Sequence, residues 1–182
     1  MKQRWALVIL GAWLMGSICM SVVATENFYT VDRLLAAPHT ALTAAVQKLG
    51  QPAARDLLRY LSSELNRLYF QLWNVAQLVL GVLVWWLIRE TRGQTPTAGL
   101  TPVRWGVLAM LAVVVLMLVY LTPAIVSLGR ELDFVPRDPA PPGMSRFWVL
   151  HAAYTSLEML KLAAGFVVAG LISRSASSVP SA

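Results

Sequence analysis

The sequence contains a series of apolar runs, each about as long as a membrane-spanning helix. They occupy residues 5–24, 65–88, 104–123 and 147–172. Because an α-helix rises about 1.5 Å per residue, roughly 20 residues cross the ~30 Å hydrocarbon core of a bilayer. We therefore expect an all-α integral membrane protein, a four-helix bundle in which residues 1–174 form a single membrane domain.

The composition favours the same class. Only 13% of the 182 residues are charged and 57% are hydrophobic, whereas a soluble domain carries about 25% charged residues. The formal net charge is +6, from 15 Lys and Arg against 9 Asp and Glu, which in a soluble protein would indicate nucleic-acid binding. Most of these basic residues flank the apolar runs, where they set topology and contact anionic headgroups. We expect the lipid bilayer, and no nucleic acid, as partner.

The first apolar run has two interpretations. It follows the basic opening Met1-Lys2-Gln3-Arg4, so residues 1–24 could be a signal peptide cleaved after Ala24. The run is longer than a usual signal sequence and carries small residues suited to close helix packing, namely Gly11, Gly16, Ser17 and Ser21. We favour a retained span. The single cysteine, Cys19, lies in this run and has no partner for an internal disulfide.

Residues 25–63, between the first two runs, are the most water-compatible part of the chain. Gly50-Gln51-Pro52 interrupts them, and Pro52 suits the first turn of a helix. On both sides of this break apolar residues recur at helical spacing: Leu42, Val46 and Leu49, then Leu57, Leu58, Leu61 and Leu65. We expect an external segment made of a short amphipathic helix, a break, and a second helix that enters the membrane without interruption.

The remaining connections carry helix-breaking residues. Residues 92–96 end in Pro96 and predict a helix stop, and Thr122-Pro123 predicts a bend in the third span. Residues 129–146 hold four prolines and charges of both signs, which favours an irregular external loop. We expect residues 175–182 to form a disordered tail.

The basic residues close to the apolar runs predict the topology. With four spans they all fall on one side of the membrane: Lys2, Arg4, Arg89, Arg92, Arg104 and Arg174. Basic residues near span ends are enriched on the cytoplasmic side. We therefore expect a multi-pass protein of the bacterial inner membrane with both termini in the cytoplasm.

Polar residues inside hydrocarbon are costly and mark candidate sites. The fourth run carries His151, Tyr154, Glu158 and Lys161 at steps of three or four, which keeps them on one helical face. The second run carries Asn74 and Gln77 in its interior, with Glu64 and Arg67 at its start. Runs two and four point the same way in a four-span chain, so we expect these two faces to meet inside the bundle.

These residues leave three functions open. Glu158 and Lys161 could form the proton- or ion-coupling site of a small oligomeric transporter, or an interhelical contact that fixes helix register. His151 could ligate haem in a membrane redox protein. The chain lacks the usual phosphate-loop, dinucleotide and hydrolase motifs. We expect a non-enzymatic structural or assembly component without cofactor, metal or catalytic residues, acting with a membrane-protein partner or as a homo-oligomer.

Short patterns in the second half of the chain resemble a known family. They are Tyr120-Leu-Thr-Pro123 followed by Leu128-Gly-Arg130, and Phe147-Trp-Val-Leu-His151 at the start of the fourth run. The sequence Glu64-Leu-Asn-Arg67-Leu-Tyr-Phe70 is also similar. Together they resemble the transmembrane-protein-205-like family of small four-span proteins, whose bacterial members form a domain of unknown function. The resemblance implies a four-helix membrane fold and no agreed activity, and Glu158 and Lys161 depart from its pattern.

Overall fold

The computed structural model describes residues 1–37, 39–89 and 101–177, and all regular structure within them is helical. The expected all-α class is confirmed. Four helices are long and apolar enough to cross a membrane. They are α1 (Lys2–Ala36), α3 (Gln51–Arg89), the continuous helix over residues 101–131, and α6 (Met144–Ser177).

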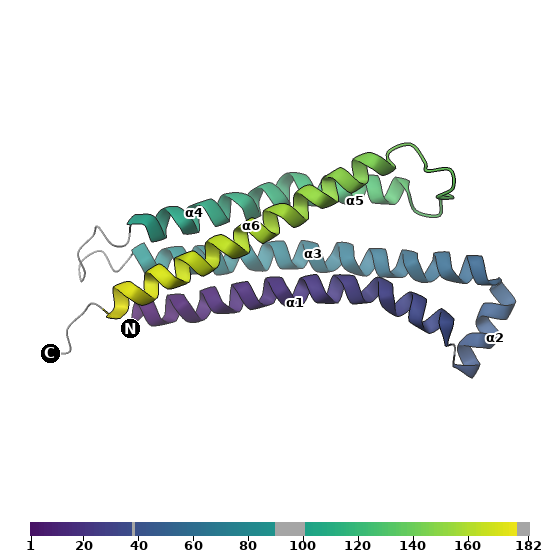
Figure 1. The fold of residues 1–182 in the computed structure, drawn as a ribbon, viewed down its shortest axis with the longest axis horizontal. Helices are drawn as coiled ribbons and strands as arrows, with labels where there is room; N and C mark the ends of the chain where they lie inside the picture. Colours follow the sequence, from purple (N-terminus) through teal and green to yellow (C-terminus); the bar gives the residue numbers. More distant parts are fainter. Residues whose placement is uncertain (38, 90–100, 178–182) are drawn as a thin grey trace.

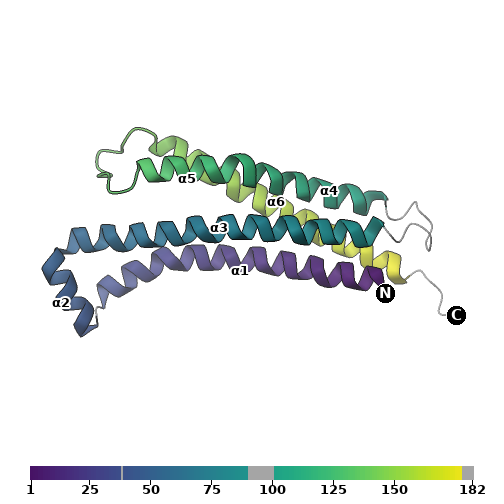
Figure 2. The same ribbon diagram turned by 180° about the vertical axis from the view of Figure 1, so that it is seen from behind.

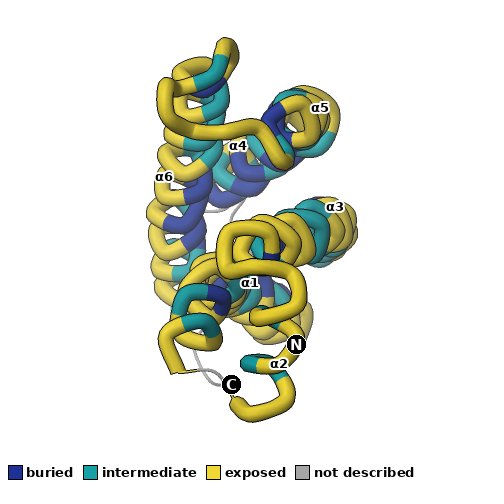
Figure 3. The backbone as a smooth tube through the Cα atoms, turned by 90° about the vertical axis from the view of Figure 1, so that its right-hand side faces the viewer, coloured by how far each residue is buried: buried dark blue, intermediate teal, exposed yellow. Residues whose placement is uncertain are grey.

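The long helices lie side by side along one common direction (Figures 1 and 2). α1 contacts α3 and α6, and α4 (Thr101–Leu116) contacts the same two helices. The N-terminus, the end of α3, the start of α4 and the end of α6 gather at one end of the molecule (Figure 1). Viewed along the helices, α6 turns its buried residues toward the others (Figure 3). The helix ends that carry the flanking basic residues therefore share one side.

The third long helix changes its winding partway along. α4 passes into η3, a π-helical turn over Met117–Leu121, and then into α5 (Thr122–Glu131). Pro123 has no N–H, so it cannot donate the bond that residue 123 of an α-helix gives to residue 119. The π turn absorbs this loss, and the N–H of Thr122 bonds to the carbonyl of Met117. The helix continues to Glu131, beyond the span expected over residues 104–123.

Between α1 and α3 the chain forms a helical hairpin. α2 (Thr40–Leu49) is followed by Gly50, whose φ of 81° lies in the left-handed region that favours glycine, and α3 begins at Gln51. α1 and α3 contain 35 and 39 residues, or about 52 and 58 Å of helix. Because the hydrocarbon core is ~30 Å thick, both helices extend well past the apolar runs on the side of α2.

Some connections differ from the sequence expectation. The first three residues of the loop expected at 129–146 belong to α5, and α6 already begins at Met144. α6 also runs to Ser177, three residues into the tail expected to be disordered. The helix stop expected at residues 92–96 and the tail residues 178–182 lie outside the described residues.

The apolar core is concentrated where all four long helices meet. Its fully buried members include Leu10, Val84, Val107 and Ile172, one from each helix. Outside this core many large apolar side chains are exposed, and Cys19 is exposed on α1.

Glycines allow the helices to approach closely. A Cβ placed on Gly16 would overlap the Trp73 indole, and one on Gly165 would overlap the Leu14 side chain. Gly11, five residues before Gly16 on α1, has nothing within 4 Å of such a Cβ. Gly11 and Gly16 therefore form a matched pair in which only the second is sterically required.

We predict that Gly16→Ala lowers the free energy of unfolding by about 1–3 kcal/mol, because the rigid indole must move. Gly11→Ala, the control, should leave stability unchanged or raise it by up to about 1 kcal/mol, since Ala favours helix. Unfolding in mixed micelles, followed by circular dichroism, measures both. Equal effects of the two substitutions would contradict the close contact of Gly16 with Trp73.

Candidate functional site: a buried polar cluster

Gln77 is the centre of the cluster. This α3 residue is 0% exposed, and its Oε1 accepts hydrogen bonds from donors on two other helices. Trp13 Nε1 of α1 donates at 2.9 Å, Ser17 Oγ lies at 3.5 Å, and Lys161 Nζ of α6 donates as well. One amide oxygen thus joins α1, α3 and α6 inside the apolar core.

Lys161 and Glu158 form an ion pair beside Gln77. Their Nζ and Oε2 atoms are 2.7 Å apart, and the two side chains are 0% and 7% exposed. They are three residues apart on α6, so the helix itself brings them together. The pair is neutral overall, which greatly reduces the cost of burying either charge. The second carboxylate oxygen, Glu158 Oε1, is buried and has no hydrogen-bond partner among the described residues.

Asn74 extends the cluster to the third long helix. Its Nδ2 donates to Thr122 Oγ1 at 2.8 Å, while its Oδ1 accepts from Tyr154 OH at 3.3 Å and from Gln77 Nε2 at 3.4 Å. Thr122 directly follows the π turn of η3. All four long helices therefore contribute to one hydrogen-bonded cluster, which comprises Trp13, Ser17, Asn74, Gln77, Thr122, Tyr154, Glu158 and Lys161.

The sequence identified five members of this cluster and missed three. Asn74, Gln77, Tyr154, Glu158 and Lys161 were expected on facing helices, and the structure brings them together. Trp13, Ser17 and Thr122 were not expected. A sequence signal existed for the first two, because residues four apart share a helical face.

His151 lies outside the cluster. It packs against the rings of Phe147 and Trp148, with centroids 4.6 and 6.2 Å away, and its buried Nδ1 has no hydrogen-bond partner in the described chain. Within the described residues, no three His, Cys, Asp or Glu side chains are grouped so that they could hold a metal ion.

Glu64 and Arg67 belong to a second group of charges near the start of the second apolar run. Arg67 pairs with Glu64 and, at 2.9 Å, with Asp133, which follows α5. Arg130 lies 3.6 Å from Glu64. The hydrogen bond from Arg67 lowers the pKa of Glu64, against the opposing effect of burial. This group ties α3 to the end of the third helix.

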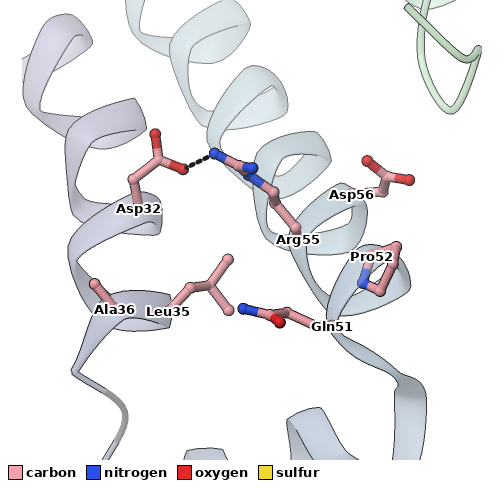
Figure 4. Close-up of a pocket in the computed structure, with 7 residues that line it drawn as sticks. All are labelled: Asp32, Leu35, Ala36, Gln51, Pro52, Arg55 and Asp56. Atoms are coloured by element: carbon pink, nitrogen blue, oxygen red, sulfur yellow. Dashed lines mark hydrogen bonds and ion pairs between the residues drawn. The ribbon is translucent and has the colours of Figure 1, made fainter.

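A third group of charges lies on the hairpin. Asp32 of α1 accepts a hydrogen bond from Arg55 of α3 at 2.8 Å, and this bond lowers the pKa of Asp32. Figure 4 shows the pair at one side of an open cavity of about 560 Å³. The cavity is lined by Asp32, Leu35, Ala36, Gln51, Pro52, Arg55 and Asp56. The Asp32–Arg55 pair bridges α1 and α3 at this cavity.

Comparisons with known proteins add no assignment. No protein-family model matches the sequence, and no curated protein and no solved structure matches it either.

We predict that Lys161→Met destabilises the protein by about 3–5 kcal/mol, because it leaves the Glu158 carboxylate buried without a counter-charge. The double variant Glu158→Gln with Lys161→Met should recover most of this loss, since both charges are then absent. Unfolding in mixed micelles measures both. Arg33→Ala, which removes an exposed ion pair with Glu26, is the control and should cost less than about 1 kcal/mol. If the double variant is as unstable as Lys161→Met alone, the charges of Glu158 and Lys161 do not stabilise each other.

Proposed function

We propose that the protein is a non-enzymatic structural or assembly component of a membrane complex. The observation that supports this proposal is the polar cluster itself: its side chains bind one another around Gln77 and come from all four long helices. Lipid tails are as apolar as the helix surfaces, so directional hydrogen bonds decide which helix faces meet. A neutral cluster of hydrogen bonds between helices therefore favours one fixed helix arrangement.

The helical hairpin supplies a surface for a partner outside the bilayer. It comprises the end of α1, α2 and the start of α3, which reach past the apolar runs. α2 has no buried residue, and Leu49 at its end is 54% exposed. We place this hairpin on the external side, with the four long helices as an antiparallel bundle across the membrane.

The orientation follows from the basic helix ends. Lys2 begins α1, Arg89 ends α3, and Arg174 lies in the last turn of α6. These ends gather on one side of the molecule (Figure 1), and basic residues next to spans are retained in the cytoplasm.

We predict that, in a Cys19→Ser background, a membrane-impermeant maleimide labels Leu49→Cys in intact spheroplasts and labels Lys2→Cys only after lysis. Labelling measured by mass shift checks both positions on the same chain. The reverse pattern would mean that the hairpin is cytoplasmic, and labelling of both positions before lysis would contradict the proposed number of membrane crossings.

A second candidate function rests on Glu158 Oε1. This buried oxygen has no partner in the described chain although its carboxylate is paired through Oε2. An acceptor left free at this depth is where a proton could bind and leave. On this alternative the protein is a small ion-coupled transporter that uses the Glu158–Lys161 pair.

Two variants distinguish the structural role from the transporter: the double variant Glu158→Gln/Lys161→Met and the hairpin variant Leu49→Glu. Native mass spectrometry in mild detergent should find a partner chain on the wild type and on the Glu158→Gln/Lys161→Met double variant, and should lose it in Leu49→Glu. Proton flux in proteoliposomes, measured on the same samples, should not differ between wild type and double variant. No reproducible partner on the wild type would contradict the structural role, and a flux lost in a folded double variant would favour the transporter.

A further inference from the structure

The outer face of α3 carries a straight apolar stripe, which we call the α3 stripe. At 3.6 residues per turn its members lie within about 60° of Val75 around the helix axis. Each is between 49% and 61% exposed. The stripe comprises Leu57, Leu61, Leu68, Leu72, Val75, Val79, Val82 and Trp86.

Gln71 interrupts this stripe with a polar group. It lies about 40° from Val75 on the same helical face, it is exposed, and its side chain has no hydrogen-bond partner among the described residues. The other three amides of the second apolar run are buried: Asn74 and Gln77 in the polar cluster, and Asn66 against α1. Gln71 falls inside the second apolar run, and an amide that faces hydrocarbon without a partner is costly.

The stripe also continues beyond the apolar run. Leu61 and Leu57 precede residue 65 by four and eight residues, or about 6 and 12 Å along the helix. Next to them Tyr60 packs against Phe134, with ring centroids 5.1 Å apart, and Phe134 is itself 61% exposed. Lipid tails that cover Leu68 to Trp86 do not reach Leu57 and Leu61. A protein helix lying along α3 would cover both parts of the stripe, and we therefore favour a protein partner on this face.

We propose that α3 packs in parallel against α3 of a second copy of this chain, with the two Gln71 amides hydrogen-bonded to each other. An amide is both donor and acceptor, so it is self-complementary across a two-fold axis. Two copies inserted in the same orientation have their Gln71 side chains at the same depth. From Leu68 to Trp86 the stripe advances in steps of three and four residues, the spacing at which the side chains of packed helices meet. This inference rests on the membrane crossing proposed above but not on the structural role.

Cysteine cross-linking in native membranes tests the face. In a Cys19→Ser background, Leu68→Cys and Val75→Cys should form disulfide-linked dimers on oxidation. Val167→Cys on α6, which is 62% exposed, is the matched control and should remain monomeric. Cross-linking at Val167 as strong as at Val75 would indicate random collision, and adducts with a different protein would show that another chain covers the stripe; either result overturns the proposal.

The role of Gln71 is tested by dilution in liposomes. Förster transfer between labelled copies should report dimers of the wild type, and Gln71→Leu should weaken dimerisation roughly 3- to 30-fold, the range for interhelical hydrogen bonds in membranes. Met159→Leu, an exposed position on α6, should have no effect. An unchanged dimer in Gln71→Leu overturns the amide pairing. A wild type that is monomeric at every dilution, yet still binds its partner chain, overturns the dimer while leaving the structural role intact.

Discussion

The charge of Lys161 inside an apolar core is the constraint on which the other contacts depend. A buried ammonium costs several kcal/mol unless it is paired and hydrogen-bonded. Glu158, one turn earlier on the same helix, supplies the counter-charge at 2.7 Å, and Gln77 of α3 supplies an amide oxygen. Because this second acceptor belongs to another helix, satisfying Lys161 fixes the rotation of α6 relative to α3.

The rotation of α6 relative to α3 then determines which side chains α1 and the third long helix turn toward α3. The oxygen of Gln77 also accepts from Trp13, so α1 must turn its indole inward. Asn74, one turn earlier, bonds to Thr122, which the π turn before Pro123 places at the start of α5. Apolar surfaces facing lipid-like neighbours prefer no particular rotation. The hydrogen bonds are directional, so they select one arrangement.

The amide side chains of α3 lie both inside the molecule and on its outer surface. Asn74 and Gln77 find their partners within the chain, whereas the side chain of Gln71, which is exposed on the outer face of α3, finds none among the described residues. The proposed pairing of α3 with a second copy supplies that missing partner. In the hairpin beyond the apolar runs, charges such as Asp32 and Arg55 join α1 to α3, and α2 has no buried residue.

Local, periodic properties were determined by the sequence itself: four long apolar helices, the break at Gly50, and the polar faces that carry Glu158 and Gln77. Each depends only on neighbours along the chain. The extension of α1 from residue 24 to Ala36 was not predicted. Residues 25–36 mix polar and apolar side chains, so no apolar run indicated that the helix continues through them. Only the tertiary structure shows that the polar cluster includes Trp13, Ser17 and Thr122. Spacing assigns a side chain to a face of its own helix, but which helix covers that face is decided by the partners that buried polar atoms must find.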